Sequence, residues 1–304
     1  MVEHVQRQES FSAESTPLGI WKEMIDHALD RYLVTPEVEP QVIHQAMRYA
    51  VLNGGSRWRP LLTLLATDAC SRWVEDVIPA ACAFELIHCS SLILDDLPCM
   101  DNAELRRGVP TCHKVFGEAI TIMTSIALLS LAHQLVLKNC QTLGVPSPVM
   151  HRLCQDIFAL TEGRGMIAGQ VRDLQQRGQH PSAAEVSTTH HHKSALLYVC
   201  AVKAGALLAG ASEEVVAHLE LYATQLGLAY QIRDDVCDVE GSPEELGKAV
   251  GMDLGKTTFV SLHGLTGAKN HARYALQSAL QALDPLGGGA NRLRELASRM
   301  VPLT

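Results

Sequence analysis

The chain has 304 residues, 47% of them hydrophobic and 19% charged, which is enough apolar sequence for a sizeable core. A net charge of −8 and an aromatic content of only 5% argue against a nucleic-acid partner, because nucleic acids are bound by basic surfaces and stacking rings. The nine cysteines form no C-x-x-C pair and the amino terminus lacks the apolar core of a signal peptide, so we expect reduced thiols and a cytoplasmic protein.

The first half of the chain shows apolar residues at helical spacing, interrupted by proline and glycine. Residues 1–17 are polar and are expected to form a flexible N-terminal tail, whereas residues 18–304 are expected to fold as one domain. The stretch 119–137 is long and apolar enough for a membrane span, but its serines, threonines and histidine favour a buried helix and a protein that does not span the membrane. Helices are predicted over 18–33, from Thr35-Pro36-Glu37, and over 41–52, 61–69, 77–94 and 119–136.

The second half continues the helical pattern, with almost no alternation of period two that would indicate strands. No linker separates the two halves. We therefore expect an all-α, single-domain helical bundle around a central cavity. Helices are predicted over 149–175, from Ser182, over 190–208 and 213–236, from Ser242, and over 271–283 and 290–300.

Two acidic clusters each follow an apolar helix. Either cluster alone is equally well interpreted as a solvated helix end, but two facing clusters would form an oxygen-rich site for magnesium. Residues 234 and 238 lie about one helical turn apart and share a face, whereas 95 and 101 need the irregularity that Pro98 allows. The first cluster holds Asp95, Asp96 and Asp101, and the second holds Asp234, Asp235 and Asp238.

Cationic side chains stand where an anion would need them. Arginine binds phosphate through two parallel hydrogen bonds, and the start of a helix also favours an anion. His88 precedes the first cluster by two turns, so it either faces the same cavity or is a core histidine. The run His190–His192 has no cysteine or histidine partner at ligand spacing and is not expected to hold a metal. The cationic candidates are Arg59, Arg106, Arg107, Lys193, Lys256 and, with ordinary surface charge as the alternative, Lys248.

In chain order these motifs resemble the trans-isoprenyl diphosphate synthases, which are all-α prenyltransferases. Asp95-Asp96-Leu-Pro-Cys-Met-Asp101 looks like the first aspartate-rich motif of that family, and Asp234-Asp235-Val-Cys-Asp238 looks like the second. The resemblance covers about residues 20 to 300, and the segment 101–108 is most similar to bacterial carotenoid-pathway geranylgeranyl diphosphate synthases. The other matching segments are 54–60, 106–108, 113–118, 169–173, 191–194 and Gln231.

The resemblance implies that isopentenyl diphosphate condenses with dimethylallyl, geranyl or farnesyl diphosphate and that diphosphate is released. Two or three magnesium ions would be held by the six aspartates, and the family also implies a homodimer. Lys193, Ser194 and Gln231 are the implied catalytic residues, the last two as oxygens that stabilise an allylic cation. The implied substrate-binding residues are Ser56, Arg59, His88, Arg106, Arg107, Lys193, Ser194, Gln231, Lys248 and Lys256.

Product length in such an enzyme depends on what blocks the apolar tunnel below the first cluster. A residue four or five positions before Asp95 lies on the tunnel side of its helix. These positions are Ser91 and Ser90, and both side chains are small. We therefore predict the twenty-carbon product, geranylgeranyl diphosphate.

One departure from the family pattern keeps alternatives open. Ser56 stands where the family usually has lysine, which weakens the expected isopentenyl diphosphate site. A farnesyl diphosphate synthase, a class I terpene cyclase and a non-catalytic subunit of a heteromeric synthase remain alternatives. Arg59 with the pair Arg106-Arg107 favours an enzyme that binds two diphosphates, and the intact aspartates argue against a non-catalytic subunit.

Overall fold

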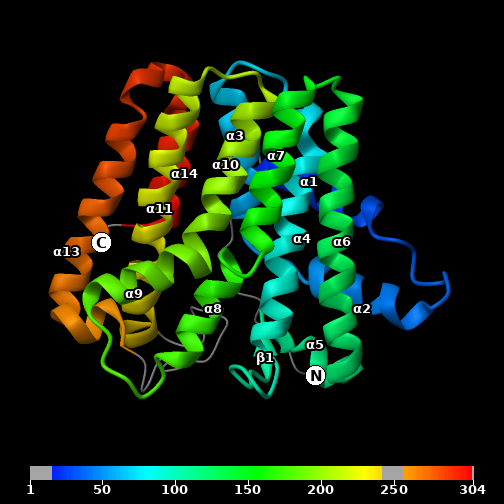
Figure 1. The fold of residues 1–304 in the computed structure, drawn as a ribbon, viewed down its shortest axis with the longest axis horizontal. Helices are drawn as coiled ribbons and strands as arrows, with labels where there is room; N and C mark the ends of the chain where they lie inside the picture. Colours follow the sequence, from blue (N-terminus) through cyan, green and yellow to red (C-terminus); the bar gives the residue numbers. More distant parts are fainter. Residues whose placement is uncertain (1–15, 242–256, 303–304) are drawn as a thin grey trace, which may run out of the picture.

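The computed structural model describes residues 16–241 and 257–302, and these ranges are almost entirely helical (Figure 1). The long helices run side by side, as expected for an all-α bundle. The helices of the first half are α1 (Pro17–Tyr32), α2 (Gln41–Leu52), α3 (Trp58–Ala69), the 3-10 turn η1 (Val74–Val77), α4 (Ile78–Asp95), α5 (Cys112–Phe116) and α6 (Glu118–Thr142). Those of the second half are α7 (Ser147–Thr161), α8 (Met166–Gln175), α9 (Ala183–His190), the π-helical η2 (His191–Ala195), α10 (Leu196–Leu208), α11 (Glu213–Glu240), α13 (Phe259–Ala282), the 3-10 η3 (Asp284–Ala290) and α14 (Asn291–Met300).

Helix α4 lies inside the bundle and packs against α1, α3, α6 and α10. All of its side chains from Ala80 to Ile87 are buried. A helix that is apolar on nearly every side, with Glu85 as the one charged residue of this stretch, is stable only when other helices surround it. Because each fully buried large apolar side chain contributes roughly 2 kcal/mol, this packing holds α4 and the acidic cluster at its carboxyl end firmly in place.

Helices α3 and α10 approach each other closely because α10 carries a glycine at the contact. A Cβ on Gly205 would lie 2.2 Å from the carbonyl oxygen of Thr63. The Thr63 hydroxyl donates to the carbonyl oxygen of Ala201 at 3.0 Å, and Thr67 donates to that of Gly205 at 3.1 Å. These bonds fix the position of α10. The predicted site residues Lys193 and Ser194 lie just before the amino end of this helix.

The first half differs from the prediction at one helix start and in one loop. The predicted start at Thr35 is wrong, because residues 34–40 form turns and bends and the next helix begins at Gln41. Proline at both 36 and 40 explains this, since proline disfavours helix in the preceding residue and lacks an amide donor. The loop after α4 also contains a short antiparallel hairpin, β1 (Leu105–Arg106) with β2 (Val109–Pro110), that the sequence pattern did not indicate.

Two boundaries in the second half differ as well. The single helix predicted over 149–175 is two, α7 and α8, because the chain turns at Gly165, where a Cβ would meet the carbonyl oxygen of Leu160 at 2.2 Å. Helix α13 begins at Phe259, well before the predicted 271, and Gly264 inside it has a left-handed φ of 67° that interrupts the periodicity. Of the predicted tail over residues 1–17, residues 1–15 lie outside the described residues, and Thr16 and Pro17 already form the start of α1. The helix predicted from Ser242 also lies outside the described residues.

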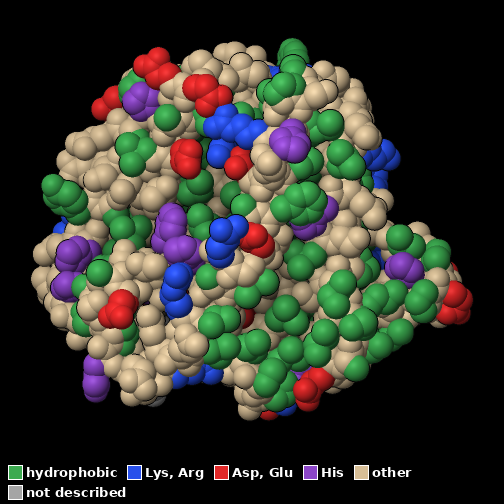
Figure 2. All heavy atoms as spheres, viewed as in Figure 1, with side chains coloured by type: hydrophobic (Ala, Val, Ile, Leu, Met, Phe, Trp, Pro, Cys, Tyr) green, Lys and Arg blue, Asp and Glu red, His purple; other side chains and the backbone are tan. Residues whose placement is uncertain are grey.

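Two helical stretches are long and apolar enough to cross a membrane by length and composition alone, Val74–Asp95 and Glu118–Thr142. Other helices cover most of the first, in which 67% of the apolar window is buried. In α6 only 39% of the window is buried, and Ile122, Met123 and Ile126 are exposed. The prediction of a buried helix therefore holds for one face of α6 only. Figure 2 shows hydrophobic side chains gathered over this part of the surface.

Candidate active site

The first acidic cluster forms where α4 ends and the chain turns sharply back. The amide of Asp101 donates to the carbonyl oxygen of Asp95 at 2.9 Å, so two residues six positions apart share one turn. Burial raises the pKa of Asp95, Lys193 and Arg106 lower it, and Asp101 and Asp173 raise it, so that together they bring it to about 6. A carboxylate that is this poorly compensated fits a site that receives a cation.

Asp96, the middle carboxylate of this cluster, is buried and binds Arg106. The guanidinium donates to one carboxylate oxygen through Nη2 at 2.5 Å and through Nε at 3.1 Å. Arg106 comes from β1, so this pair anchors the hairpin to the end of α4. In this arrangement Asp96 orients an arginine that was predicted to bind diphosphate.

The second acidic cluster lies near the carboxyl end of α11, at the same end of the bundle as the first (Figure 1). Asp235 is buried and accepts a hydrogen bond from the amide of Phe259, the first residue of α13, at 2.9 Å. Its carboxylate also lies 4.0 Å from Nε2 of His190. Asp235 therefore joins α11 to α13, while Asp234 and Asp238 lie one helical turn apart on α11.

Lys193 and Ser194 lie between the two clusters, in the π-helical segment η2. The Lys193 ammonium pairs with Asp173 of α8 at 2.8 Å. Burial alone would lower the pKa of Lys193, but the carboxylates of Asp95 and Asp173 raise it, so the side chain remains charged. The Ser194 hydroxyl donates to Oε1 of Gln231 on α11 at 2.8 Å. The structure therefore brings the three predicted catalytic residues to one place.

Two residues of this region were not among the predicted site residues. Asp173 pairs with Lys193, and Arg177 donates to Asp101 at 2.6 Å and to the carbonyl oxygen of Met100 at 2.8 Å. The sequence offered one signal for the Asp173–Lys193 contact, because a glycine inside a helix, here Gly169, indicates that another segment approaches closely. In the structure a Cβ on Gly169 would lie 2.3 Å from the amide nitrogen of Lys193. Arg177 stands in a polar loop and left no such signal.

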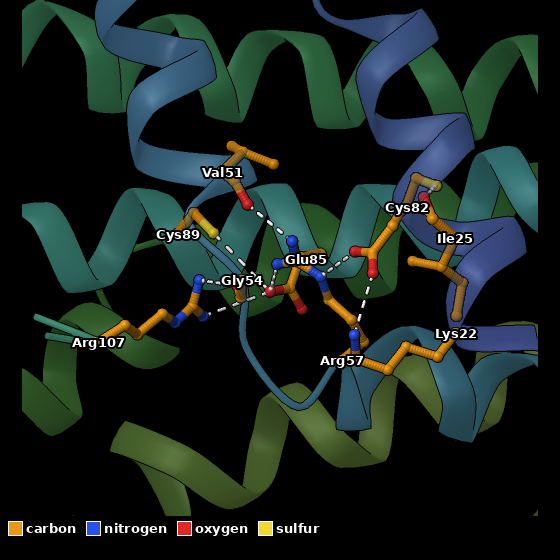
Figure 3. A network of polar contacts seen from close by, with 10 residues as sticks. Lys22, Ile25, Val51, Gly54, Arg57, Cys82, Glu85, Cys89 and Arg107 are labelled. Carbon is orange, nitrogen blue, oxygen red and sulfur yellow. Dashed lines mark hydrogen bonds and ion pairs between the residues drawn. The ribbon is translucent and has the colours of Figure 1, made fainter. Parts of the chain in front are cut away.

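A buried ionic network lies beside the amino end of α3 (Figure 3). Arg57 donates to Glu85 of α4 at 2.6 Å, to Asp26 of α1 at 2.7 Å and to the carbonyl oxygen of Val51 at 2.8 Å. The guanidinium of Arg107 lies 3.5 Å from the same Glu85 oxygen. Glu85 is thus shared between an arginine that is entirely committed to the fold and a predicted substrate ligand.

Arg107 reaches this network by crossing the glycine pair that precedes α3. Its Nη1 donates to the carbonyl oxygen of Gly54 at 2.5 Å. Gly55 has a φ of 121°, and a Cβ there would lie 2.7 Å from the Arg107 guanidinium carbon. The two glycines therefore permit a backbone conformation and a close approach that other residues would obstruct.

The predicted isopentenyl diphosphate residues gather beside this network. Arg59 lies with its guanidinium 4.7 Å from the ring centre of Tyr198. Burial and the charges of Arg59 and Arg107 lower the pKa of His88, so this imidazole stays neutral at physiological pH. Ser56 is exposed at the edge of the same region.

The remaining predicted residues fall into two groups. Ser90 and Ser91 lie on α4 one turn before Asp95, and their hydroxyls donate to the carbonyl oxygens of Ile87 at 2.8 Å and His88 at 2.9 Å. Ser90 is buried and Ser91 is partly exposed. Lys248 and Lys256 lie outside the described residues.

The fold, with two carboxylate clusters and several arginines at one end, defines an all-α protein of the isoprenoid synthase type. The profile of the polyprenyl synthetase family matches residues 40–285, so the chain belongs to this family. It is a trans-prenyltransferase by this membership and by the relatives it matches.

Curated relatives with different products match the chain equally well. It is 40% identical over 264 residues to the farnesyl diphosphate synthase of Geobacillus stearothermophilus, covering 86% of this chain and 88% of that protein. It is also 40% identical over 272 residues to the mitochondrial geranylgeranyl pyrophosphate synthase 6 of Arabidopsis thaliana, covering 85% and 81%.

Solved structures agree with the fold. A farnesyl/geranylfarnesyl diphosphate synthase of Zymomonas mobilis superposes with a TM-score of 0.83 at 31% identity, over 93% of this chain and 97% of that one. A geranyltransferase of Helicobacter pylori, solved with magnesium and isoprenyl diphosphate, gives 0.81 at 29% identity, over 94% and 97%.

Proposed function

We propose that this prenyltransferase condenses isopentenyl diphosphate with dimethylallyl, geranyl and farnesyl diphosphates and that geranylgeranyl diphosphate is its end product. The observation that carries the proposal is the convergence of Lys193, Ser194 and Gln231 between two acidic clusters, beside Arg59 and Arg107. The small side chains at positions 90 and 91 support the twenty-carbon length, and the segment 101–108 supports a carotenoid-pathway type. Farnesyl diphosphate synthase is the alternative, since relatives of both kinds match the chain.

Magnesium fits the residues of this site. In the described ranges no three carboxylate, histidine or cysteine side chains converge on a single ion position. Magnesium commonly takes only one or two protein carboxylates and fills its other positions with water and phosphate oxygens. We propose that Asp95, Asp101, Asp234 and Asp238 hold two or three ions together with the diphosphate. When bound, the ions would neutralise charge on the departing diphosphate.

The chain's own residues then orient both substrates. Lys193 and Arg106 hold the allylic diphosphate and help to stabilise the negative charge that grows as its carbon–oxygen bond breaks. Arg59, Arg107 and the neutral His88 hold isopentenyl diphosphate, so that its double bond attacks the allylic carbon and forms the new carbon–carbon bond. The cation that results loses a proton from a neighbouring carbon to the released diphosphate, which leaves a new allylic double bond. The oxygens of Ser194 and Gln231 stabilise the cation between the two substrates. The surrounding apolar helices keep water away from it.

The test is incubation of the purified protein with labelled isopentenyl diphosphate and each allylic primer in turn, followed by sizing of the products. All three primers are expected to give geranylgeranyl diphosphate. A fifteen-carbon end product would identify the farnesyl alternative. Cyclic hydrocarbons formed without use of isopentenyl diphosphate would indicate a terpene cyclase. Elongation only after a second subunit is added would indicate a non-catalytic subunit.

Ser56 offers a direct test of the isopentenyl diphosphate site. Replacing Ser56 by lysine is expected to lower the KM for isopentenyl diphosphate by about threefold to tenfold, because an exposed charge-assisted hydrogen bond to phosphate contributes roughly 1 kcal/mol. The KM for farnesyl diphosphate should stay unchanged. Ser56→Met adds length without charge and serves as the control. A lysine variant with the wild-type KM would place position 56 away from this substrate.

We further propose that the enzyme is a homodimer joined through an apolar face on α6 and α7. This apolar face consists of Ile122, Met123, Ile126 and Leu137 of α6 and Phe158 of α7, which are 40–59% exposed. Monomeric proteins rarely leave so many large apolar side chains together in water. A second copy of the chain fits this face, because in a two-fold dimer the same apolar face of each subunit contacts that of the other.

A charge in the centre of the apolar face is expected to separate the dimer. Ile126→Glu should elute as a monomer, because pairing would bury an uncompensated carboxylate next to its own symmetry mate. Light scattering coupled to size-exclusion chromatography measures the mass. Leu221→Glu is the matched control, since Leu221 is 50% exposed on α11 and lies outside the apolar face. A dimeric Ile126→Glu variant would rule out this interface.

A further inference from the structure

Tyr198 of α10 is a buried tyrosine that neither the predicted chemistry nor the core packing explains completely. It exposes 0% of its surface, and its hydroxyl has no hydrogen-bond partner among the residues that the structure describes. The other fully buried tyrosine, Tyr222 of α11, donates its hydroxyl to the carbonyl oxygen of Leu293 at 2.9 Å. A buried hydroxyl without a partner is unfavourable, so something else about this position must require an aromatic ring.

The ring of Tyr198 carries the guanidinium of Arg59 on one face, at 4.7 Å from the ring centre. Tyr230 of α11 meets the same ring in an edge contact at 5.8 Å. At Gly227 a Cβ would lie 3.3 Å from Cδ2 of Tyr198, so the absence of a side chain there leaves room for the ring. The aromatic plane is therefore held in a fixed position under the guanidinium.

Arg59 differs from its neighbouring arginines in how it is held. Arg57 pairs with Glu85 and Asp26, Arg106 with Asp96, and Arg107 with Glu85. Within the described ranges no carboxylate pairs with Arg59, and its Nε is buried without a partner. Burial raises the pKa of Tyr198, so the phenol beneath Arg59 is neutral. The positive charge of Arg59 is thus held without being cancelled.

We propose that Tyr198 is a positioning residue that presents Arg59, with its full charge, to the diphosphate of isopentenyl diphosphate. The proposal rests on the proposed function. An aromatic face attracts a guanidinium but leaves its hydrogen-bond donors free. A carboxylate in the same place would occupy those donors and compete with the diphosphate. Tyr198 lies one helical turn after Ser194, so the same face of this segment serves both the diphosphate and the reacting carbon.

The test compares two replacements at Tyr198. Tyr198→Phe keeps the ring, and its KM for isopentenyl diphosphate should stay within about twofold of wild type. Tyr198→Leu removes the ring, and the same KM should rise about thirtyfold, the size expected for a desolvated cation–π contact. The KM for farnesyl diphosphate and the secondary structure by circular dichroism should not change. Tyr222→Leu, an equally buried replacement on α11, should lower stability and leave both KM values unchanged.

Results for the Tyr198 variants test the positioning role, whereas the activity of the wild-type protein tests the proposed function. Equal KM values in Tyr198→Leu and wild type, or an equal rise for both substrates, would overturn the positioning role. A large rise in Tyr198→Phe would assign the effect to the hydroxyl and would also overturn it. If the leucine variant is insoluble, Tyr198→Met provides a flexible filler without a ring, with the same expectation. A wild-type protein that never consumes isopentenyl diphosphate would refute the proposed function itself.

Discussion

Replacing Asp95 by asparagine is expected to lower kcat for chain elongation by about a hundredfold to a thousandfold. An amide cannot supply the charge that holds a divalent cation against the leaving diphosphate, and a loss of about 3–4 kcal/mol of transition-state stabilisation gives this factor. Steady-state assays with labelled isopentenyl diphosphate measure it. Asp284→Asn, an exposed carboxylate on η3 far from the clusters, should retain wild-type kcat. An active Asp95→Asn enzyme would refute the proposed metal site.

The same replacement is expected to stabilise the metal-free protein at neutral pH. The pKa of Asp95 is raised from 3.8 to about 6 in the folded state, mainly by burial. Between these values the folded state binds more protons than the unfolded state, so wild-type stability falls as pH rises from about 4 to about 6. Because the carboxylate is only partly buried, the expected loss is about 1–2 kcal/mol.

Thermal unfolding in a chelator at pH 4.5 and pH 7 checks this expectation. Wild type should lose stability between the two values, and Asp95→Asn should lose less. Magnesium binding should weaken below about pH 6 for the same reason, because the protonated carboxyl is a poor ligand. Identical pH dependence in the two proteins would show that Asp95 is not the group responsible.

Replacing Ser91 by phenylalanine is expected to shorten the end product from twenty to fifteen or ten carbons. Ser91 lies one helical turn before Asp95 and is partly exposed, and its hydroxyl is satisfied within α4 by the carbonyl oxygen of His88. Under the proposed function the growing chain passes below the first acidic cluster, and a phenyl ring at this position would block that path. Chromatography of the dephosphorylated products measures the length.

Ser90 provides the companion variant. Ser90→Phe is expected to shorten the product as well, but its side chain is buried, so overpacking should also cost about 1–3 kcal/mol of stability. Ser90→Ala and Ser91→Ala are the controls and should leave product length unchanged, since alanine keeps the tunnel open. If both phenylalanine variants made the wild-type product, neither serine would line the tunnel.

The helices and the two acidic clusters were predictable because their signals are local. Apolar residues at helical spacing marked α4 and α11. The first cluster begins at the last residue of α4, and the second lies in the last two turns of α11. The helix boundaries that were predicted wrongly also have local causes in the sequence. The two prolines before Gln41 prevent an earlier helix start, and Gly264 interrupts the pattern of α13.

Helical periodicity and motif order were enough to predict the all-α fold and the chemical types of the candidate residues. The partners of these side chains became clear only once the helices were packed: Asp96 pairs with Arg106, Asp173 with Lys193, and the ring of Tyr198 with Arg59. The physical reason is that helical periodicity depends on neighbours within one or two turns. Pairing between helices depends on how closely backbones approach, as at Gly169 and Gly205, and no periodic pattern records that approach.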